Sequence, residues 1–124
     1  MNVELNKIIE ITVNALNDKK AKEITAIEVG ELTVIAEYFI LATATSSTHV
    51  KALADIVEEK LSEAGFEPDH IEGKSTGWIL LDYAGVVIHV FTKDTREFYN
   101  LDRLWSDGKQ INLDNILTSV REEI

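Results

Sequence analysis

Two apolar runs separated by two small residues constrain the fold of this 124-residue chain more than any other feature. The first run extends from Trp78 to Tyr83 and the second from Val86 to Phe91, with Ala84-Gly85 between them. Runs of this length joined by so short a connection are typical of a β-hairpin. The sequence therefore predicts two neighbouring antiparallel strands.

The register of this hairpin depends on the turn. A two-residue turn would place Ala84 at positive φ, which costs about 1 kcal/mol or more in a residue other than glycine. A three-residue loop with Gly85 as the left-handed bulge residue avoids that strain, and we favour it. The choice decides which side chains of the second strand share a face with Trp78, Leu80 and Asp82.

The segment after the hairpin, from Asp94 to Trp105, interleaves aromatic and charged residues. Trp, Tyr and Arg dominate the energetics of protein interfaces, so this composition favours an interaction surface over a reaction centre. Tyr99, Leu101 and Trp105 cannot all face one side of a regular helix. Some of them should be exposed or pack against the edge of the sheet.

Three further side chains of this region are compatible with two roles. Trp78 suits the core and an interface equally well. Arg96 and Arg103 are the arginines nearest to the aromatic residues, and each could bridge a carboxylate or the backbone of a partner.

The first half of the chain is predicted from periodicity and from helix-stop signals. Apolar residues recur at helical spacing from Val3 to Lys19, with an acid early and bases at the end. The same spacing follows the N-cap candidates Ser46-Ser47 and stops at Gly65. Ile24 to Val29 and the apolar run Tyr38 to Thr43 predict strands, the second of them buried on both faces.

The remaining elements complete a mixed sheet. Phe66 to Ile71 contains Pro68, which is typical of an edge strand. A last amphipathic segment is predicted from Asp114, with Ile116, Leu117 and Val120 on its apolar side. The order α-β-β-α-β-β-β-α predicts an α/β fold: one domain in which a mixed five-stranded sheet is flanked by helices.

The net charge of -10 limits the possible partners. Phosphate backbones and anionic lipids repel such a chain, so direct sequence-specific nucleic-acid binding is disfavoured. A basic protein is the natural partner, although acidity that only maintains solubility is equally compatible. The chain has no cysteine, no signal peptide and no apolar run near the ~20 residues that span a membrane. We therefore expect a cytoplasmic protein that has no membrane contact.

No motif predicts a catalytic residue, a cofactor or a metal site. Thr43 to Ser47 leads from a strand into a helix N-terminus, where anions can bind, but without glycines ordinary capping is favoured. The histidines lack metal spacing, and His89 is expected to be hydrogen-bonded and half-buried. Four carboxylates lack the Asp-x-Asp pairing of two-metal sites and are expected to be solvated or salt-bridged: Asp82, Asp94, Glu97 and Asp102.

Several short motifs follow one another in a specific order. They are Ala36 to Thr43, Thr45-Ser46-Ser47 with His49 to Ala52, Glu72-Gly73, Gly77 to Tyr83, Val87 to Phe91, and Arg96 to Trp105. Together they resemble the ribosomal silencing factor family, also called RsfS or iojap-like proteins. The resemblance covers residues 1–108 as one domain and leaves 109–124 as a tail that we expect to be partly helical. Three positions depart from the family pattern. Glu37 stands where aspartate is usual, Gly85 where a turn aspartate is common, and Asp102 where glutamate is common.

The resemblance implies an α/β fold similar to that of nucleotidyltransferases but without their catalytic carboxylates. It also implies a non-enzymatic function, in which the protein binds the large ribosomal subunit through ribosomal protein L-fourteen. The bound protein would block joining of the small subunit and so repress translation when nutrients run short. Two alternatives stay open. One is a nucleotide-binding or nucleotidyl-transfer enzyme with a site near Thr45 to Ser47, and the other is a homodimeric adaptor that uses the hairpin or an edge strand.

We expect the partner-binding surface on the hairpin face and on the segment after it. Trp78 is the expected apolar anchor, because a central aromatic side chain often carries much of the binding energy. Carboxylates around it would face a basic partner. The other members of the predicted surface are Leu80, Asp82, Arg96, Glu97, Tyr99, Asp102 and Trp105.

Overall fold

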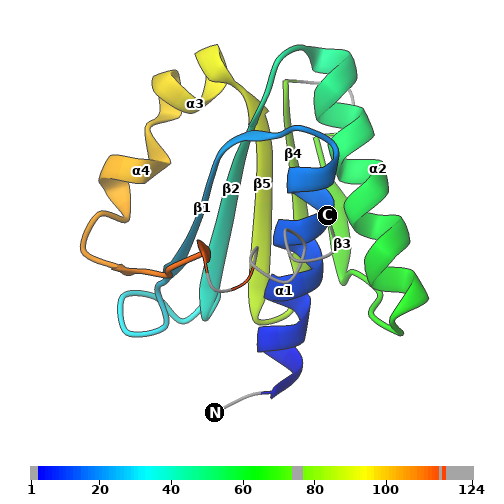
Figure 1. Ribbon diagram of the computed structural model, residues 1–124. Helices are drawn as coiled ribbons and strands as arrows, with labels where there is room; N and C mark the ends of the chain where they lie inside the picture. The colour runs from blue at the N-terminus through cyan, green and yellow to red at the C-terminus, as the bar shows by residue number, and fades with distance from the viewer. Residues whose placement is uncertain (1–2, 74–76, 115, 117–124) are drawn as a thin grey trace.

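The computed structural model describes residues 3–73, 77–114 and 116. Within them, six strands form one sheet in the order β3-β4-β5-β2-β1-β6, and helices lie on both of its faces (Figure 1). The predicted α/β domain with a mixed sheet is confirmed, with six strands in place of five. The elements are α1 (Val3–Asp18), β1 (Lys22–Glu28), β2 (Tyr38–Ala44), α2 (Ser47–Glu63), β3 (His70–Glu72), β4 (Trp78–Tyr83), β5 (Val86–Thr92), α3 (Lys93–Tyr99), α4 (Leu101–Leu104) and β6 (Lys109–Gln110).

Helices α1 and α2 lie together on one face of the sheet (Figure 1). Their apolar stripes are buried, with Leu16 and Leu53 fully inaccessible to solvent. The Ser46 hydroxyl accepts a 3.1 Å hydrogen bond from the His49 backbone N–H and so caps α2. Gly65 follows the last turn at φ 93°. Both predicted helices, the Ser46 cap and the left-handed glycine are confirmed. Within the described part of the chain, no helix has the length and apolarity that a membrane crossing requires.

The centre of the sheet consists of β2 and β5, which run parallel to each other. Every residue of β2 from Phe39 to Ala44 is buried, and so is every residue of β5 from Val86 to Phe91. Such continuous apolar runs are required because side chains from both faces of these strands pack into a core. The prediction that β2 is buried on both faces is confirmed.

The hairpin of β4 and β5 has the register that we did not favour. Tyr83 pairs with Val86, so Ala84-Gly85 is a two-residue turn, and Ala84 has a φ of 61°. The Ala84 N–H donates to an Asp82 carboxylate oxygen over 2.9 Å, which supports this strained backbone. The prediction of a bulge at Gly85 is wrong for a second reason. A Cβ on Gly85 would lie 2.6 Å from a Leu5 methyl group, so the glycine provides room for α1 and not a left-handed φ.

Two other predictions need correction at the edges of the sheet. The edge strand β3 contains only His70–Glu72 and starts after Pro68, because proline cannot donate to the strand ladder. The sixth strand, β6, was not predicted. It adds Lys109–Gln110 to β1, which brings the beginning of the predicted tail into the sheet. The amphipathic segment predicted from Asp114 lies mainly outside the described residues.

The second face of the sheet carries a smaller core. Its buried members include Phe39 of β2 and Phe91 of β5, and the side chains of Leu101 and Trp105 pack against them. Helices α3 and α4 lie on the side of β1 and β2, away from β3 (Figure 1). Consequently β4 alternates between fully buried residues on the α1–α2 side and partly exposed residues on this second side.

Candidate protein-binding surface

The partly exposed residues of β4 and β3 form a surface that we call the open sheet face, defined as His70, Glu72, Trp78, Leu80 and Asp82. Glu72 pairs with Leu80, and His70 pairs with Asp82, so these side chains lie on one face of the sheet. A hollow of about 440 Å³ lies at one end of it, and its lining includes Trp78, Leu80 and Glu72. The open sheet face therefore combines apolar side chains with carboxylates.

Trp78 lies at the border between the core and the solvent. Its indole N–H donates a 3.2 Å hydrogen bond to Nδ1 of His89, and its ring lies 5.8 Å from the Phe91 ring. The Tyr99 ring lies 4.8 Å away on the outer side. One part of the indole is thus held by buried groups, while another part lines the hollow. Trp78 is therefore partly buried against the second core and partly exposed, which keeps it available as a contact residue.

His89 lies beneath Trp78 and is buried, with 5% of its surface exposed. Burial lowers its pKa from 6.5 to about 4, so the imidazole is neutral near pH 7. Because Nδ1 accepts from the indole, the ring proton is assigned to Nε2, which has no hydrogen-bond partner among the described residues. The predicted hydrogen bond is confirmed, but His89 is buried and not half-buried. The reason is that β5 is a central strand buried on both faces, and His89 lies in the second core beside Phe39.

Asp82 has partners of its own at the far end of β4. One of its carboxylate oxygens accepts the Ala84 N–H, and the other lies 3.6 Å from Nδ1 of His70. Nε2 of His70 also lies 2.9 Å from a Glu72 carboxylate oxygen. These three side chains give the open sheet face an acidic edge, with two carboxylates around one imidazole.

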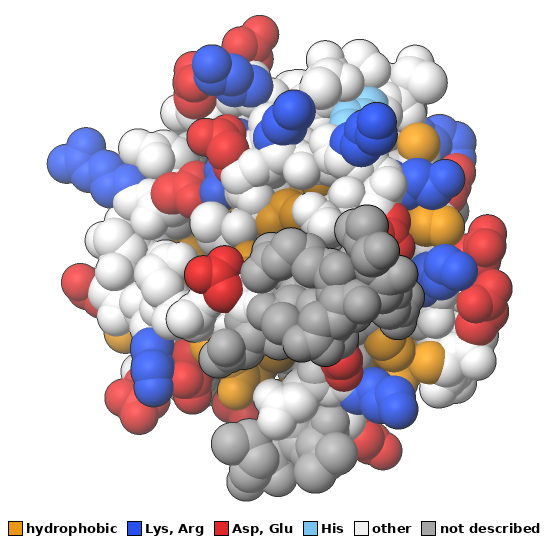
Figure 2. Space-filling model, viewed as in Figure 1, with side chains coloured by type: hydrophobic (Ala, Val, Ile, Leu, Met, Phe, Trp, Pro, Cys, Tyr) orange, Lys and Arg blue, Asp and Glu red, His pale blue; other side chains and the backbone are white. Residues whose placement is uncertain are grey.

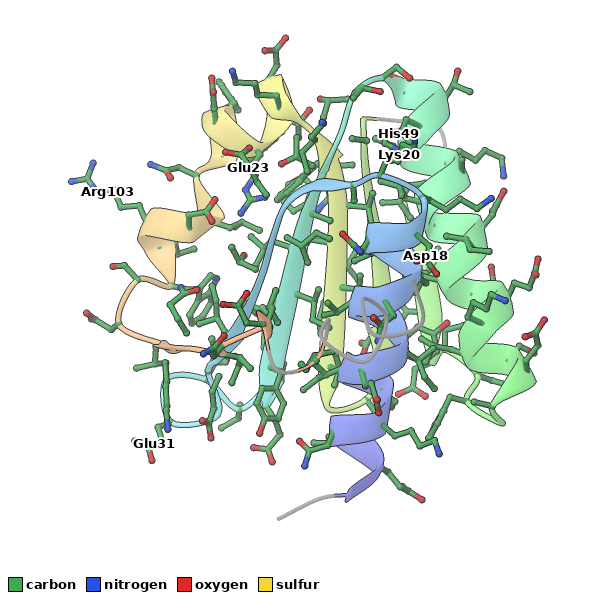
Figure 3. The ribbon with its side chains drawn as sticks, viewed as in Figure 1. Asp18, Lys20, Glu23, Glu31, His49 and Arg103 are labelled. Atoms are coloured by element: carbon green, nitrogen blue, oxygen red, sulfur yellow. The ribbon has the colours of Figure 1, made fainter. Side chains whose placement is uncertain are left out.

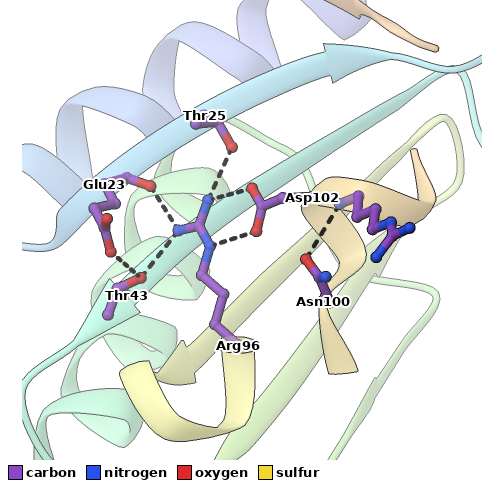
Figure 4. Close-up of polar contacts among 7 residues, drawn as sticks. Glu23, Thr25, Thr43, Arg96, Asn100 and Asp102 are labelled. Atoms are coloured by element: carbon purple, nitrogen blue, oxygen red, sulfur yellow. Dashed lines mark hydrogen bonds and ion pairs between the residues drawn. The ribbon is translucent and has the colours of Figure 1, made fainter. Parts of the chain in front are cut away.

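Arg96 does not lie on the surface, although the prediction included it there (Figure 4). Its guanidinium forms two hydrogen bonds with the Asp102 carboxylate, at 2.9 and 2.7 Å. It also donates to the backbone oxygen of Glu23 over 2.7 Å and to the Thr43 hydroxyl over 2.9 Å. The Arg96 hydrogen bonds lower the pKa of Asp102, against the opposing effect of burial. This pair therefore fastens α3 and α4 to β1 and β2, and we assign it a structural role.

The other predicted members are distributed between the surface and the second core. Glu97 is exposed, and Tyr99 has 54% of its surface exposed. Trp105 is partly buried, with its ring 5.1 Å from the Phe39 ring. The expectation that some of these aromatics are exposed and others pack on the sheet is confirmed. Sequence reasoning missed Phe98, which is 81% exposed beside Tyr99, although its place between Glu97 and Tyr99 in the aromatic segment was a usable signal.

The N-terminal end of α2 is built by local capping, as predicted. The His49 ring accepts a 2.9 Å hydrogen bond from the Thr45 N–H through Nδ1, and its Nε2 lies 2.8 Å from the Lys19 carbonyl oxygen. A wide hollow of about 800 Å³ lies in front of this helix end, and Lys22 and Lys93 contribute to its lining. Among the described residues, no group of three or more His, Asp or Glu side chains is placed to hold a metal ion.

Charged side chains of both signs are visible on the opposite face. On the side of α1 and α2, acidic and basic groups are interspersed with apolar areas and uncharged atoms (Figure 2). The labelled Asp18 and Lys20 lie on or near this face, whereas Arg103 points away from the domain on the α4 side (Figure 3). The open sheet face differs from this surface because it places a tryptophan and a leucine on one face of the sheet with two carboxylates.

Comparisons with known proteins show the family and the fold of this chain. The family model for the ribosomal silencing factor during starvation matches residues 2–124. A ribosomal silencing factor from Halalkalibacterium halodurans is 34% identical over 113 residues, which are 90% of this chain and 97% of the relative. A crystal structure of a Chromobacterium violaceum protein matches with a TM-score of 0.80 and 36% sequence identity. The match covers 86% of this chain and 88% of the Chromobacterium violaceum chain.

A eukaryotic relative has a name that refers to the large subunit. The mouse protein named mitochondrial assembly of ribosomal large subunit protein 1 is 29% identical over 102 residues, or 79% of this chain and 45% of the mouse protein. The family model and the bacterial relative both extend over most of the chain, and the crystal structure has the same fold. This chain therefore belongs to the ribosomal silencing factor family.

Proposed function

We propose that this protein is a non-enzymatic repressor of translation that binds the large ribosomal subunit in the cytoplasm. Its contact would be ribosomal protein L-fourteen, and the bound protein would occupy space that the small subunit needs. Family membership supports the ribosomal role. The observation that carries the choice of surface is the open sheet face, where the apolar side chains of Trp78 and Leu80 share one face with the carboxylates of Glu72 and Asp82.

The chemistry of this surface suits a basic protein better than RNA. Aromatic and aliphatic side chains at the centre of an interface provide most of the affinity, while charges at the rim determine the partner and the association rate. Asp82 and Glu72 provide negative charge beside Trp78 and Leu80. A phosphate backbone would be repelled by these carboxylates and by the net charge of -10.

The structure changes which predicted residues we propose as contacts. Trp78, Leu80, Asp82, Glu97 and Tyr99 are at least partly exposed and remain in the proposed surface. The buried Arg96 and its partner Asp102 would act indirectly, because they hold the helix that carries Tyr99. We propose the same supporting role for Trp105, which packs on Phe39.

Co-sedimentation with separated ribosomal subunits tests this function. We expect the protein to sediment with large subunits and not with small subunits, without added nucleotide. Binding should weaken as salt is raised, because charge contributes to it. Equal capture by isolated ribosomal RNA, or no sedimentation with large subunits, would exclude the proposal.

A nucleotide-binding enzyme is the second candidate, and one observation favours it. The hollow in front of α2 combines a helix N-terminus, several hydroxyl groups, and Lys22 and Lys93, which can attract phosphates, although Glu23 and Asp94 also line it and offset this positive charge. Calorimetric titration with ATP and GTP separates the two candidates, since only the enzyme requires saturable binding. A homodimer that pairs through β3 or the hairpin is a weaker proposal, which sedimentation equilibrium of the isolated protein would test.

A further inference from the structure

The loop between β1 and β2, residues 29–37, exposes three apolar side chains that the proposed function does not use. Val34 is fully exposed, Ile35 is 67% exposed and Leu32 is 45% exposed. Adjacent apolar side chains with this exposure are uncommon on a monomer unless they meet another molecule. We call these three residues the loop tip.

The loop is held in place by hydrogen bonds at its base and within its tip. The Val29 N–H donates to the Glu37 carbonyl oxygen over 2.8 Å, and the Glu37 N–H donates to the Gly85 carbonyl oxygen over 2.8 Å. Within the tip, the Ile35 N–H donates to the Thr33 hydroxyl over 3.2 Å. The fold therefore presents the apolar side chains on a defined backbone, which lowers the entropic cost of binding.

Acidic groups lie beside Leu32 of the loop tip. Glu28, Glu31 and Asp107 line a hollow of about 370 Å³ next to it, together with one basic residue, Lys109. Figure 3 shows the Glu31 side chain at the outer end of the loop. The pKa of Tyr38 at the base of the loop is raised by burial first, and then by two nearby carboxylates. This combination of an apolar tip and an acidic rim is complementary to a segment with both apolar and basic side chains.

We propose that the loop tip is a second docking point, and that it receives a basic, partly apolar segment of a large-subunit protein. This inference rests on the proposed function. RNA and anionic lipid are unsuitable occupants because the carboxylates repel them. A second copy is also unfavourable, since a symmetric contact would bring the two acidic rims together. Trp78 pairs with Phe91 at one end of β5, whereas the loop base contacts Gly85 before the other end. The base of the loop therefore lies roughly 20 Å from Trp78 along the sheet.

Site-specific photo-crosslinking on purified large subunits tests this inference. Val34, Tyr99 or the control residue Lys60 is replaced by p-benzoylphenylalanine, and the crosslinked peptides are identified by mass spectrometry. Val34 is fully exposed, so its replacement disturbs no packing. We expect position 34 to crosslink to a lysine- or arginine-rich peptide of a ribosomal protein, and position 60 on α2 to give no such product.

The outcomes separate this inference from the proposed function. Crosslinks at position 99 without any at position 34 would overturn the second docking point and leave the proposed function standing. Crosslinks from position 34 only to ribosomal RNA, or only to another copy of this chain, would also overturn it. A protein that does not sediment with large subunits at all would overturn both.

Paired variants measure the contribution of the loop to affinity. Val34→Ser combined with Ile35→Ser should weaken large-subunit binding by about tenfold with little change in the melting temperature, because Val34 is fully exposed and Ile35 is mostly exposed in the free protein. Glu31→Gln should weaken binding more than Glu59→Gln, an identical charge change on the exposed side of α2. Unchanged affinity in the double variant would refute the docking point.

Discussion

Trp78 is partly buried and partly exposed, since its indole N–H donates to the buried His89 and part of its ring lines the hollow. Trp78→Ala should abolish detectable large-subunit binding, with a loss of about 2 kcal/mol or more, as is common for a central aromatic contact. The matched control is Lys60→Ala on the exposed side of α2, which should bind normally. Binding is measured by co-sedimentation, beside a thermal melt of each variant.

The thermal melt of the Trp78→Ala variant shows whether lost binding comes from a lost contact or from unfolding. The substitution also leaves the buried Nδ1 of His89 without its donor, so some loss of stability is expected. Trp78→Phe keeps an aromatic ring and provides a milder change. A folded Trp78→Ala variant that sediments like the unsubstituted protein would remove this residue from the proposed surface.

His89 should make the stability of the domain depend on pH. Its pKa is about 4 when folded and near 6.5 in the unfolded chain, so the unfolded chain binds the proton first. The stabilising contribution of neutral His89 is therefore complete above about pH 6.5 and is lost as the pH falls toward 4. Between pH 7 and pH 5 the loss should be about 2 kcal/mol.

The His89→Gln variant isolates this effect, because glutamine can accept from the indole but does not titrate. Urea unfolding at the two pH values should show a smaller pH dependence in this variant than in the unsubstituted protein. The exposed His70 provides the control, and His70→Gln should leave most of the dependence in place. An identical pH dependence in the His89 variant and the unsubstituted protein would contradict the buried neutral imidazole.

Substitutions at the two residues of the turn between β4 and β5 should change the free energy of unfolding in opposite directions. Ala84→Gly should raise the free energy of unfolding by about 1 kcal/mol, since it removes the strain of a φ of 61°. Gly85→Ala should lower it by about 1–3 kcal/mol, because the new methyl group would overlap the Leu5 side chain. Urea titrations measure both values. The reverse order of stability would indicate the bulged register.

At the level of elements, the short helices α3 and α4 depend on the Arg96 network. Arg96→Ala should lower the free energy of unfolding by about 3 kcal/mol, because buried hydrogen-bond partners would lose their donor. Arg103→Ala is the control on the same pair of helices. Its side chain is exposed, so a change within about 0.5 kcal/mol is expected. Equal stability of the two variants in urea would show that the Arg96 hydrogen bonds do not stabilise α3 and α4.

The long elements and the alternation of β4 could be predicted from the sequence, because periodicity and capping are local. Trp78, Leu80 and Asp82 share a face in any strand of period two. The burial of Arg96 could not be predicted, since its hydrogen-bond partners Glu23 and Thr43 lie 73 and 53 residues away in the chain. Strand β6 has two residues, too few to show a pattern.

The predicted hairpin register was wrong because the backbone strain at Ala84 is offset by contacts that include residues distant in the sequence, which the sequence does not reveal. The Asp82 carboxylate accepts the Ala84 N–H, and the Gly85 carbonyl oxygen accepts N–H groups from Glu37 and Tyr38. These contacts, together with the packing of α1 over the turn, outweigh a strain of about 1 kcal/mol at Ala84. The β4 residues of the predicted surface still lie on one face in spite of this error. The register changes which β5 residues pair with them, whereas side chains along β4 alternate between the two faces in either register.

At the scale of the whole molecule, the domain has faces with different chemistry. Helices α1 and α2 present a surface of mixed charge (Figure 2). The open sheet face presents Trp78 and Leu80 together with two carboxylates, and the loop tip presents apolar side chains beside three acidic residues and one lysine. A protein that acts by occupying space needs no catalytic group, only a stable body and a surface that holds it in place. Two separated docking points would restrict its orientation better than one.

Subunit joining, followed by light scattering, tests the central claim most directly. Purified large subunits are mixed with an excess of the protein before small subunits are added, without nucleotide. The account predicts that formation of whole ribosomes falls as the protein is added, and that an equal amount of the Trp78→Ala variant leaves it unchanged. Normal joining in the presence of saturating, large-subunit-bound protein would contradict the claim that this protein represses translation by blocking the small subunit.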